Sequence, residues 1–190
     1  MAMRAPCLPQ GGVIGICSPS HVAERGRYAR IEAGIRALGF QVREANNLYR
    51  DTYGYLATPE ERAADFHQLL YDEDVRLIFF GGGEGGNELL PLLDFDAIRR
   101  HPKRMASFSD GTTLLCAIWA KTGLETYYGP SPSCFEALSD YDRGQFLHHL
   151  VLDDAACHRA AGPWHTLVPG QAEGILVGGY TRNFALLLGS

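Results

Sequence analysis

The chain has 190 residues, of which 46% are apolar and 21% charged, and its formal net charge is -5. That apolar content suffices for one sizeable core, so we expect one domain, or one domain with part of another. No cluster of Lys and Arg suggests contacts with a phosphate backbone, so nucleic acid is not expected as a partner. The longest apolar run, Leu114 to Ala120, is too short to cross a bilayer, so no membrane association is expected.

The cysteines and the N-terminus favour a cytoplasmic protein. The five cysteines are odd in number and lack C-x-x-C spacing, which suits reduced thiols better than disulfides or a zinc site. No apolar segment of a signal peptide follows Arg4. The seven histidines have no metal-ligand spacing with Cys, Asp or Glu, and no motif for a cofactor stands out. We therefore expect neither a metal nor another cofactor.

Short apolar segments of strand character alternate with amphipathic helical segments, which is typical of a parallel α/β sheet. In chain order, strands are expected at Val13–Cys17, Gln41–Ala45, Arg76–Phe80, Arg104–Phe108 and Glu125–Tyr128. Helices are expected at Ala23–Leu38, Thr58–Tyr71, Asn87–Leu93, Phe95–His101, Thr112–Lys121 and Asp142–Leu152. The predicted fold class is α/β: an open, mainly parallel sheet flanked by helices, as in flavodoxin-like and Rossmann-like domains.

The C-terminal part breaks this alternation. Residues 1–165 are expected to form the α/β domain, and 166–190 a linker with the start of a second domain that is largely missing. Within Gly174–Leu188 the pattern predicts a strand, a turn at Gly178-Gly179 and the first residues of a helix.

The segment Ser107–Gly111 lies between a predicted strand and a predicted helix. A serine at such a turn, here Ser109, is held at the carboxyl edge of the sheet, and the N–H groups of the next helix point at the same place. The segment is close to G-x-S-x-G, which favours a nucleophile. The alternative is that Ser109 or Asp110 only caps the helix.

A second candidate site is the glycine-rich segment Gly81–Gly86, which follows the third predicted strand. Its backbone can approach a ligand closely and turn N–H groups outward. It formally satisfies G-x-G-x-x-G, but a dinucleotide fingerprint normally follows the first strand, and no G-K-[ST] ending makes it a P-loop. A flexible surface loop and a nucleotide-binding module remain alternatives. Both candidate segments fall at carboxyl ends of strands, where open α/β sheets bind ligands.

Several blocks of the sequence resemble the LD-carboxypeptidase family of serine peptidases. Gly82–Asp94 is similar to the family block Gly-Gly-Tyr-Gly-Ser-Asn-x-Leu-Leu-Pro-x-Leu-Asp, and Pro102–Asp110 is similar to its Pro-Lys followed by Gly-Tyr-Ser-Asp, whose serine is the nucleophile. Shorter matches occur, in family order, at Ser18–Ser20, Gly54–Ala57, Glu61–Asp65, Lys121–Leu124, Tyr128–Pro130, Glu173-Gly174 and Val177–Gly179. The resemblance covers nearly the whole chain.

This resemblance implies a two-domain hydrolase with a Ser-Glu-His triad, acting on small peptides. Family members remove a terminal D-alanine from murein peptides during cell-wall recycling in the cytoplasm. Ser109 matches the nucleophile, whereas the chain ends before the expected Glu and His, so we expect the 190 residues alone to be inactive. The resemblance places the oxyanion and substrate-binding residues at Asp110, Gly82, Gly83, Glu84, Ser18 and Ser20. A homodimer is the one assembly we consider.

The related microcin-C immunity hydrolases cleave an amide in peptidyl or aminoacyl nucleotides. The sequences of Trp119–Gly123 and Tyr127–Pro130 resemble that branch slightly more. A non-catalytic ligand-binding α/β domain is a further alternative. The chain also departs from the family pattern. Ser107 replaces a glycine, Gly111 a β-branched residue and Glu84 a tyrosine, while Tyr180-Thr181 stand at the usual Asn-Leu. A carboxylate at position 84 would repel another acid and so alter substrate choice.

Overall fold

The computed structural model describes residues 2–152 and 160–188. Five parallel strands form one sheet in the order β2-β1-β3-β4-β5. The strands are β1 (Val13–Cys17), β2 (Gln41–Glu44), β3 (Val75–Phe80), β4 (Arg104–Ser107) and β5 (Tyr127–Tyr128). The expected α/β class is therefore confirmed, with the flavodoxin-like strand order.

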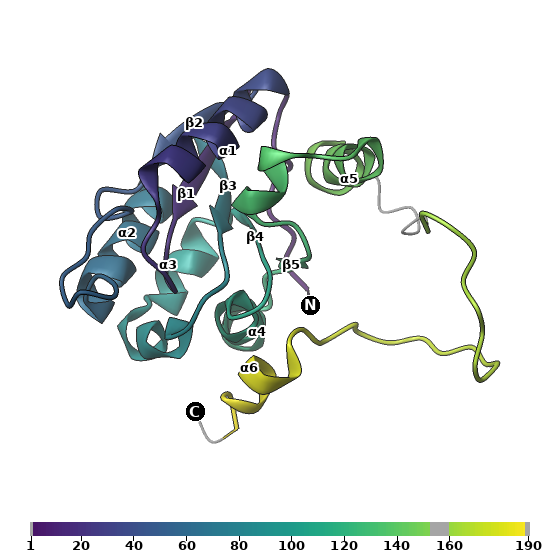
Figure 1. Cartoon of the computed structure of the whole chain (residues 1–190). Helices are drawn as coiled ribbons and strands as arrows, with labels where there is room; N and C mark the ends of the chain where they lie inside the picture. Colours follow the sequence, from purple (N-terminus) through teal and green to yellow (C-terminus); the bar gives the residue numbers. More distant parts are fainter. Residues whose placement is uncertain (1, 153–159, 189–190) are drawn as a thin grey trace.

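Helices cover both faces of this sheet (Figure 1). Alternate strand residues point to opposite faces. Leu77 and Phe79 of β3 pack in the cluster with α1 (Arg25–Ala37), η2 (Pro132–Glu136), α5 (Asp140–Phe146) and η3 (Leu147–Val151). Ile78 and Phe80 pack in the cluster with α2 (Pro59–Tyr71), η1 (Gly86–Leu92), α3 (Phe95–Arg100) and α4 (Gly111–Thr122). Both faces of the central strand are thus buried from Leu77 to Phe80, which explains the apolar sequence of these four residues.

Local signals in the sequence account for several helix ends. At α2 the amide of Glu61 donates to Thr58 Oγ1 at 3.2 Å, and the amide of Thr58 donates to Glu61 Oε2 at 2.9 Å. This reciprocal pair is a capping box, and Pro59 occupies the first helical position. Gly123 ends α4 in the left-handed conformation with φ 74°, which a glycine adopts without strain.

The sheet order places a switch point between β1 and β3. The chain leaves β1 towards β2 on one side, whereas β3, β4 and β5 lie on the other side. The loops that follow β1 and β3 therefore diverge at the carboxyl edge, and such a crevice is where open α/β sheets bind ligands. The two candidate segments of the sequence lie after β3 and β4, next to this crevice.

Beyond residue 160 the chain runs along the outside of the domain before α6 (Thr181–Ala185) reaches α4 (Figure 1). The strand expected after Gly174 is wrong: residues 174–178 form no strand in the structure, and no described strand offers them a hydrogen-bonding partner. The helix expected at Asn87–Leu93 is a 3-10 helix, since Pro91 lies inside it. Apolar side chains of the C-terminal segment are exposed: Trp164, Leu167, Val168, Ile175, Leu176 and Val177.

Candidate active site

Ser109 lies in the turn between β4 and α4, with a left-handed backbone of φ 54°. It is the one non-glycine residue with positive φ in the described parts of the chain. The turn is closed by the amide of Gly111, which donates to the carbonyl of Phe108 at 3.0 Å, and by that of Thr112, which donates to the carbonyl of Ser109 at 3.0 Å. Left-handed backbone costs an L-residue about 1–2 kcal/mol. Such strain is typical of functional turns, and strand-turn-helix nucleophiles share it.

Asp110 ties this turn to three other segments. Its Oδ2 accepts hydrogen bonds from Ser20 Oγ at 2.6 Å and from the amide of Gly86 at 2.8 Å, and its Oδ1 accepts one from Asn183 Nδ2. The side chain is buried and makes no capping hydrogen bond to α4. The capping alternative is therefore wrong for Asp110. Its carboxylate instead holds the loops after β1, β3 and β4 and the helix α6 together.

The glycine-rich loop after β3 packs directly against the turn at Ser109. A Cβ at Gly82 would lie 2.7 Å from the Cβ of Ser109 and 3.2 Å from its Oγ, and one at Gly83 would overlap the carbonyl oxygen of Ser20. Only glycine therefore fits at these positions. The amide of Glu84 donates to the carbonyl of Ser20 at 2.9 Å and that of Gly86 to Asp110, so two of the loop's N–H groups are unavailable to a phosphate. This weakens the nucleotide-cradle alternative.

The two serines after β1 are both buried and bonded within the protein. Ser18 Oγ donates to the carbonyl of His21, and Ser20 Oγ donates to Asp110. Their hydroxyls shape the loop that faces the glycine segment. The structure thus brings Ser20, Gly82, Gly83 and Asp110 to the turn of Ser109, whereas Ser18 contacts its own loop.

A cavity of about 360 Å³ opens beside Ser109. It is lined by the glycine-rich loop, the turn at Ser109 and the helix α6, through Gly83, Glu84, Gly85, Asn87, Ser109, Asp110, Tyr180, Arg182, Asn183 and Leu186. The part of α6 in this wall is held by the amide of Tyr180, which donates to Thr112 Oγ1 at 2.8 Å. The C-terminal segment therefore helps to form the cavity around the serine.

Tyr128 and His21 contact the site, although neither was among the site residues expected from the sequence. The amide of Ser109 donates to the Tyr128 hydroxyl at 3.1 Å. The His21 ring packs on Gly81, and its Nε2 lies 2.9 Å from the Tyr28 hydroxyl. Burial lowers the pKa of His21, outweighing the opposite effect of the Gly82 backbone, and Arg27 lowers it further. Among the described residues, no imidazole or carboxylate is hydrogen-bonded to Ser109 Oγ.

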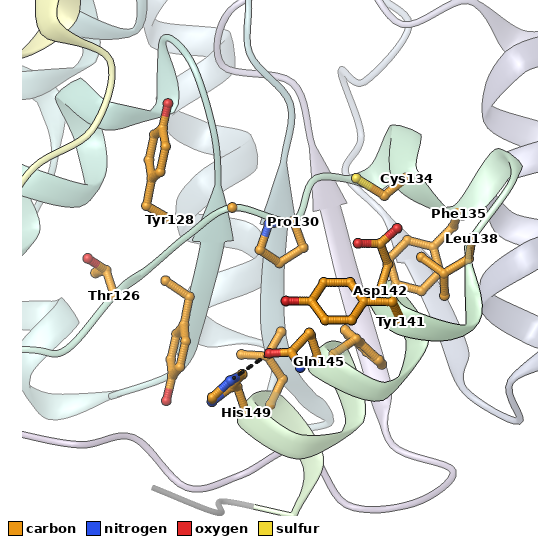
Figure 2. Close-up of a pocket in the computed structure, with 14 residues that line it drawn as sticks. Thr126, Tyr128, Pro130, Cys134, Phe135, Leu138, Tyr141, Asp142, Gln145 and His149 are labelled. Carbon is orange, nitrogen blue, oxygen red and sulfur yellow. Dashed lines mark hydrogen bonds between the residues drawn. The ribbon is translucent and has the colours of Figure 1, made fainter. Parts of the chain in front are cut away.

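A second cavity of about 460 Å³ lies between β5 and the helices α5 and η3 (Figure 2). Aromatic side chains dominate its lining, among them Tyr127, Phe135, Tyr141 and Phe146. Gln145 Oε1 and His149 Nε2 lie 3.2 Å apart on one side of it, and Tyr128 points away from them (Figure 2). Tyr128 lines this cavity and also accepts the hydrogen bond from the amide of Ser109.

Within the described residues, no group of three His, Cys, Asp or Glu side chains is arranged to hold a metal ion. No helix there combines the length and the apolar character needed to cross a membrane. The described lining of the cavity beside Ser109 presents a serine hydroxyl, backbone N–H groups and charged side chains.

The structure combines a left-handed serine turn with a glycine-rich loop at the carboxyl edge of a parallel sheet, an arrangement that α/β hydrolases also use. Residues 14–129 match the family model described as LD-carboxypeptidase N-terminal domain. The chain belongs to the LD-carboxypeptidase family, as its sequence motifs predicted.

Three proteins with related sequences support this family assignment. A putative carboxypeptidase of Vibrio cholerae is 39% identical over 68% of this chain and 40% of its own length. A probable murein peptide carboxypeptidase of Bacillus subtilis is 32% identical over 97% of this chain and 58% of its own length. The microcin C7 self-immunity protein MccF of Escherichia coli is 38% identical over 68% of this chain and 38% of its own length. The chain thus spans less than two thirds of each of these relatives.

Solved structures agree with this placement. MccF in complex with glutamyl sulfamoyl guanosine matches with a TM-score of 0.73 and 33% identity, over 77% of this chain and 46% of that one. An MccF-like protein from Bacillus anthracis matches with a TM-score of 0.74 and 31% identity, over 79% of this chain and 47% of that one.

Proposed function

We propose that this chain is the nucleophile-bearing part of a serine-type LD-carboxypeptidase, with Ser109 as the nucleophile. The observation that carries the proposal is the left-handed Ser109 in a strand-turn-helix junction that opens on a cavity. A solved MccF variant described as an active-site mutant has a serine among its replaced residues, which supports a serine at the centre of this family's chemistry.

The backbone N–H groups of Asp110 and Gly83 are the proposed oxyanion donors. Both belong to segments that meet at Ser109, and neither N–H is taken up by the backbone hydrogen bonds of the described residues. In the attack, Ser109 Oγ bonds to the carbonyl carbon and loses its proton to a base, while the carbonyl oxygen gains negative charge. Fixed N–H donors about 3 Å from that oxygen stabilise it.

We propose that the base and the group that orients it are not among the residues that contact Ser109 in this structure. We assign 1–165 to the nucleophile domain and 166–190 to a linker and the start of a second domain. Loss of triad members costs on the order of 10⁴ to 10⁶ in turnover. Release of D-alanine from an LD-tetrapeptide by the purified 190-residue chain should therefore stay near background. Robust release that disappears in Ser109→Ala would show instead that the chain completes its own triad.

The nucleophile assignment is tested by labelling with a fluorophosphonate and locating the label by peptide mass spectrometry. Ser109 should react faster than every other serine, because the oxyanion donors act even without a base, and added imidazole should accelerate it by supplying one. Ser109→Ala should remove this label. Gly82→Ala should slow it, since a Cβ there would displace Ser109, whereas Gly144→Ala, in open space, should not. Labelling of Ser109 at the rate of the other serines would overturn the proposal.

A second candidate substrate class is the aminoacyl or peptidyl nucleotides of the microcin-C immunity branch. The likeness to MccF, which has been solved with sulfamoyl nucleotides, favours it. Thermal shift with aspartyl sulfamoyl adenosine, compared with N-acetyl-L-alanyl-D-alanine, separates the two classes. Stabilisation by the nucleotide alone would assign the chain to that branch.

A further inference from the structure

An ion pair connects two walls of the cavity beside Ser109. Arg182 Nη1, from α6, lies 3.4 Å from Glu84 Oε1 of the glycine-rich loop. Both residues line the same cavity as Ser109. Their side chains remain 69% and 66% exposed, respectively, so a ligand that enters the cavity can reach both of them.

The pair is weakly held. Its 3.4 Å separation is longer than the 2.7–2.9 Å typical of charge-assisted hydrogen bonds, and exposed ion pairs add little to stability. A guanidinium has five N–H donors and binds a carboxylate with two parallel hydrogen bonds, of which Glu84 takes one at most here. A better-placed carboxylate can therefore replace Glu84 on Arg182 at small cost.

The other charged groups near the cavity are less available. The Asp110 carboxylate already accepts three hydrogen bonds and is buried. Glu88, beyond Gly85, is paired with the buried Arg62. Arg182 is thus the cationic side chain among the residues that line the cavity, and Glu84 is the acidic one facing it.

We propose that Arg182 binds the free C-terminal carboxylate of the substrate, and that Glu84 competes for Arg182 and repels a second negative charge. The proposal rests on the function assigned to Ser109, because the carboxylate belongs to the residue released there. Substrates are then peptides with one free terminal carboxylate and no further acidic group at that end. Glu84, which replaces the tyrosine of the family pattern, sets this selection.

The test measures binding of N-acetyl-L-alanyl-D-alanine and of its C-terminal amide to the full 190-residue chain carrying Ser109→Ala, by NMR titration at low salt. The acid should bind about tenfold more tightly than the amide, since one charge-assisted contact differs between them. Arg182→Gln should bring this ratio close to one. Glu84→Gln should raise the affinity for the acid about threefold and leave that for the amide unchanged.

The control is an ion pair of similar exposure on α3, formed by Asp96 and Arg99. Asp96→Asn and Arg99→Gln should leave the ratio unchanged. An unaltered ratio in Arg182→Gln, or no detectable binding of the acid, would overturn the proposal. Fluorophosphonate labelling of Ser109 distinguishes failure of the nucleophile assignment from failure of the carboxylate-binding assignment. A labelled Ser109 with an unaltered ratio refutes only the carboxylate assignment, whereas the expected ratio without labelling refutes the nucleophile and leaves a carboxylate-binding cavity.

Discussion

The hydroxyl of Ser107 occupies the space beside α4 that a side chain at position 111 would need. A Cβ built on Gly111 overlaps Ser107 Oγ, and Gly111 is buried against Phe80. The family pattern has a glycine at the first of these positions and a β-branched residue at the second. The two departures of this sequence therefore compensate each other: a side chain is present at position 107 instead of position 111, and it fills the space beside the turn at Ser109.

Gly111→Thr alone should destabilise the protein by about 3 kcal/mol, because the new side chain would overpack a buried site. Ser107→Gly combined with Gly111→Thr should recover most of this loss. The measurement is urea unfolding of the wild type, both single variants and the double variant. A coupling energy of at least about 1 kcal/mol is expected for residues in contact. Additive effects would mean that the two departures are independent.

Ser109→Gly should be more stable than Ser109→Ala by about 1 kcal/mol. Alanine keeps the left-handed strain at φ 54°, whereas glycine adopts that conformation without it. Both variants lack the hydroxyl, so the difference in stability between them reports the cost of the left-handed backbone conformation. Thermal unfolding of the two proteins side by side provides the measurement, and equal midpoints would show that the turn stores no strain.

Asp110→Ala should lower the free energy of unfolding by about 3 kcal/mol or more. The change leaves the hydroxyl of Ser20, the amide of Gly86 and the side chain of Asn183 without their acceptor at a buried site, and each such group costs about 1–3 kcal/mol. Asp96→Ala, at an exposed aspartate, should stay within about 0.5 kcal/mol of the wild type. Similar losses in both variants would contradict a central role for Asp110.

The protein should lose stability between pH 7 and pH 5 in part through His21. Burial lowers the pKa of His21 in the folded state, so the unfolded chain binds more protons below pH 6.5 or so. Its contribution to stability is therefore complete above that pH and falls as the pH decreases. We expect the free energy of unfolding, measured with urea at pH 7 and at pH 5, to fall less between these pH values in His21→Gln than in the wild type. The matched variant at the exposed His101, His101→Gln, should fall as much as the wild type. An unchanged fall in His21→Gln would refute this.

The sequence predicted β1 and β3 most directly, because buried parallel strands are rich in consecutive apolar residues, as in Val13–Cys17 and Leu77–Phe80. Val13–Cys17 matches β1, and the other strands agree within one or two residues. The start of α2 followed from the Thr58–Glu61 capping box, a signal that acts within one helical turn. The strand after Gly174 was predicted from the same kind of pattern, but a strand forms only where a neighbouring backbone pairs with it.

The positions of the candidate residues were predictable where they depend on local sequence, and not where they depend on distant contacts. The placement of Ser109 and of the glycine-rich loop after strands followed from their motifs, and their roles stay predictions. The partners of Asp110 could not, because no local pattern links Ser20 or Asn183 to it. Tyr128 likewise reaches Ser109 only through the pairing of β5 with β4.

The hydrogen bonds of Asp110 join residues separated by 90, 24 and 73 positions along the chain. Each closes a loop whose entropic cost must be met before the contact contributes to stability, and non-local contacts of this kind slow folding. The turn at Ser109 can acquire its final geometry only when β1, β3, β4 and α6 have all assembled. During refolding, the proposed reactivity of Ser109 towards a fluorophosphonate should therefore appear after the helical signal, so that labelling reports completion of the whole domain.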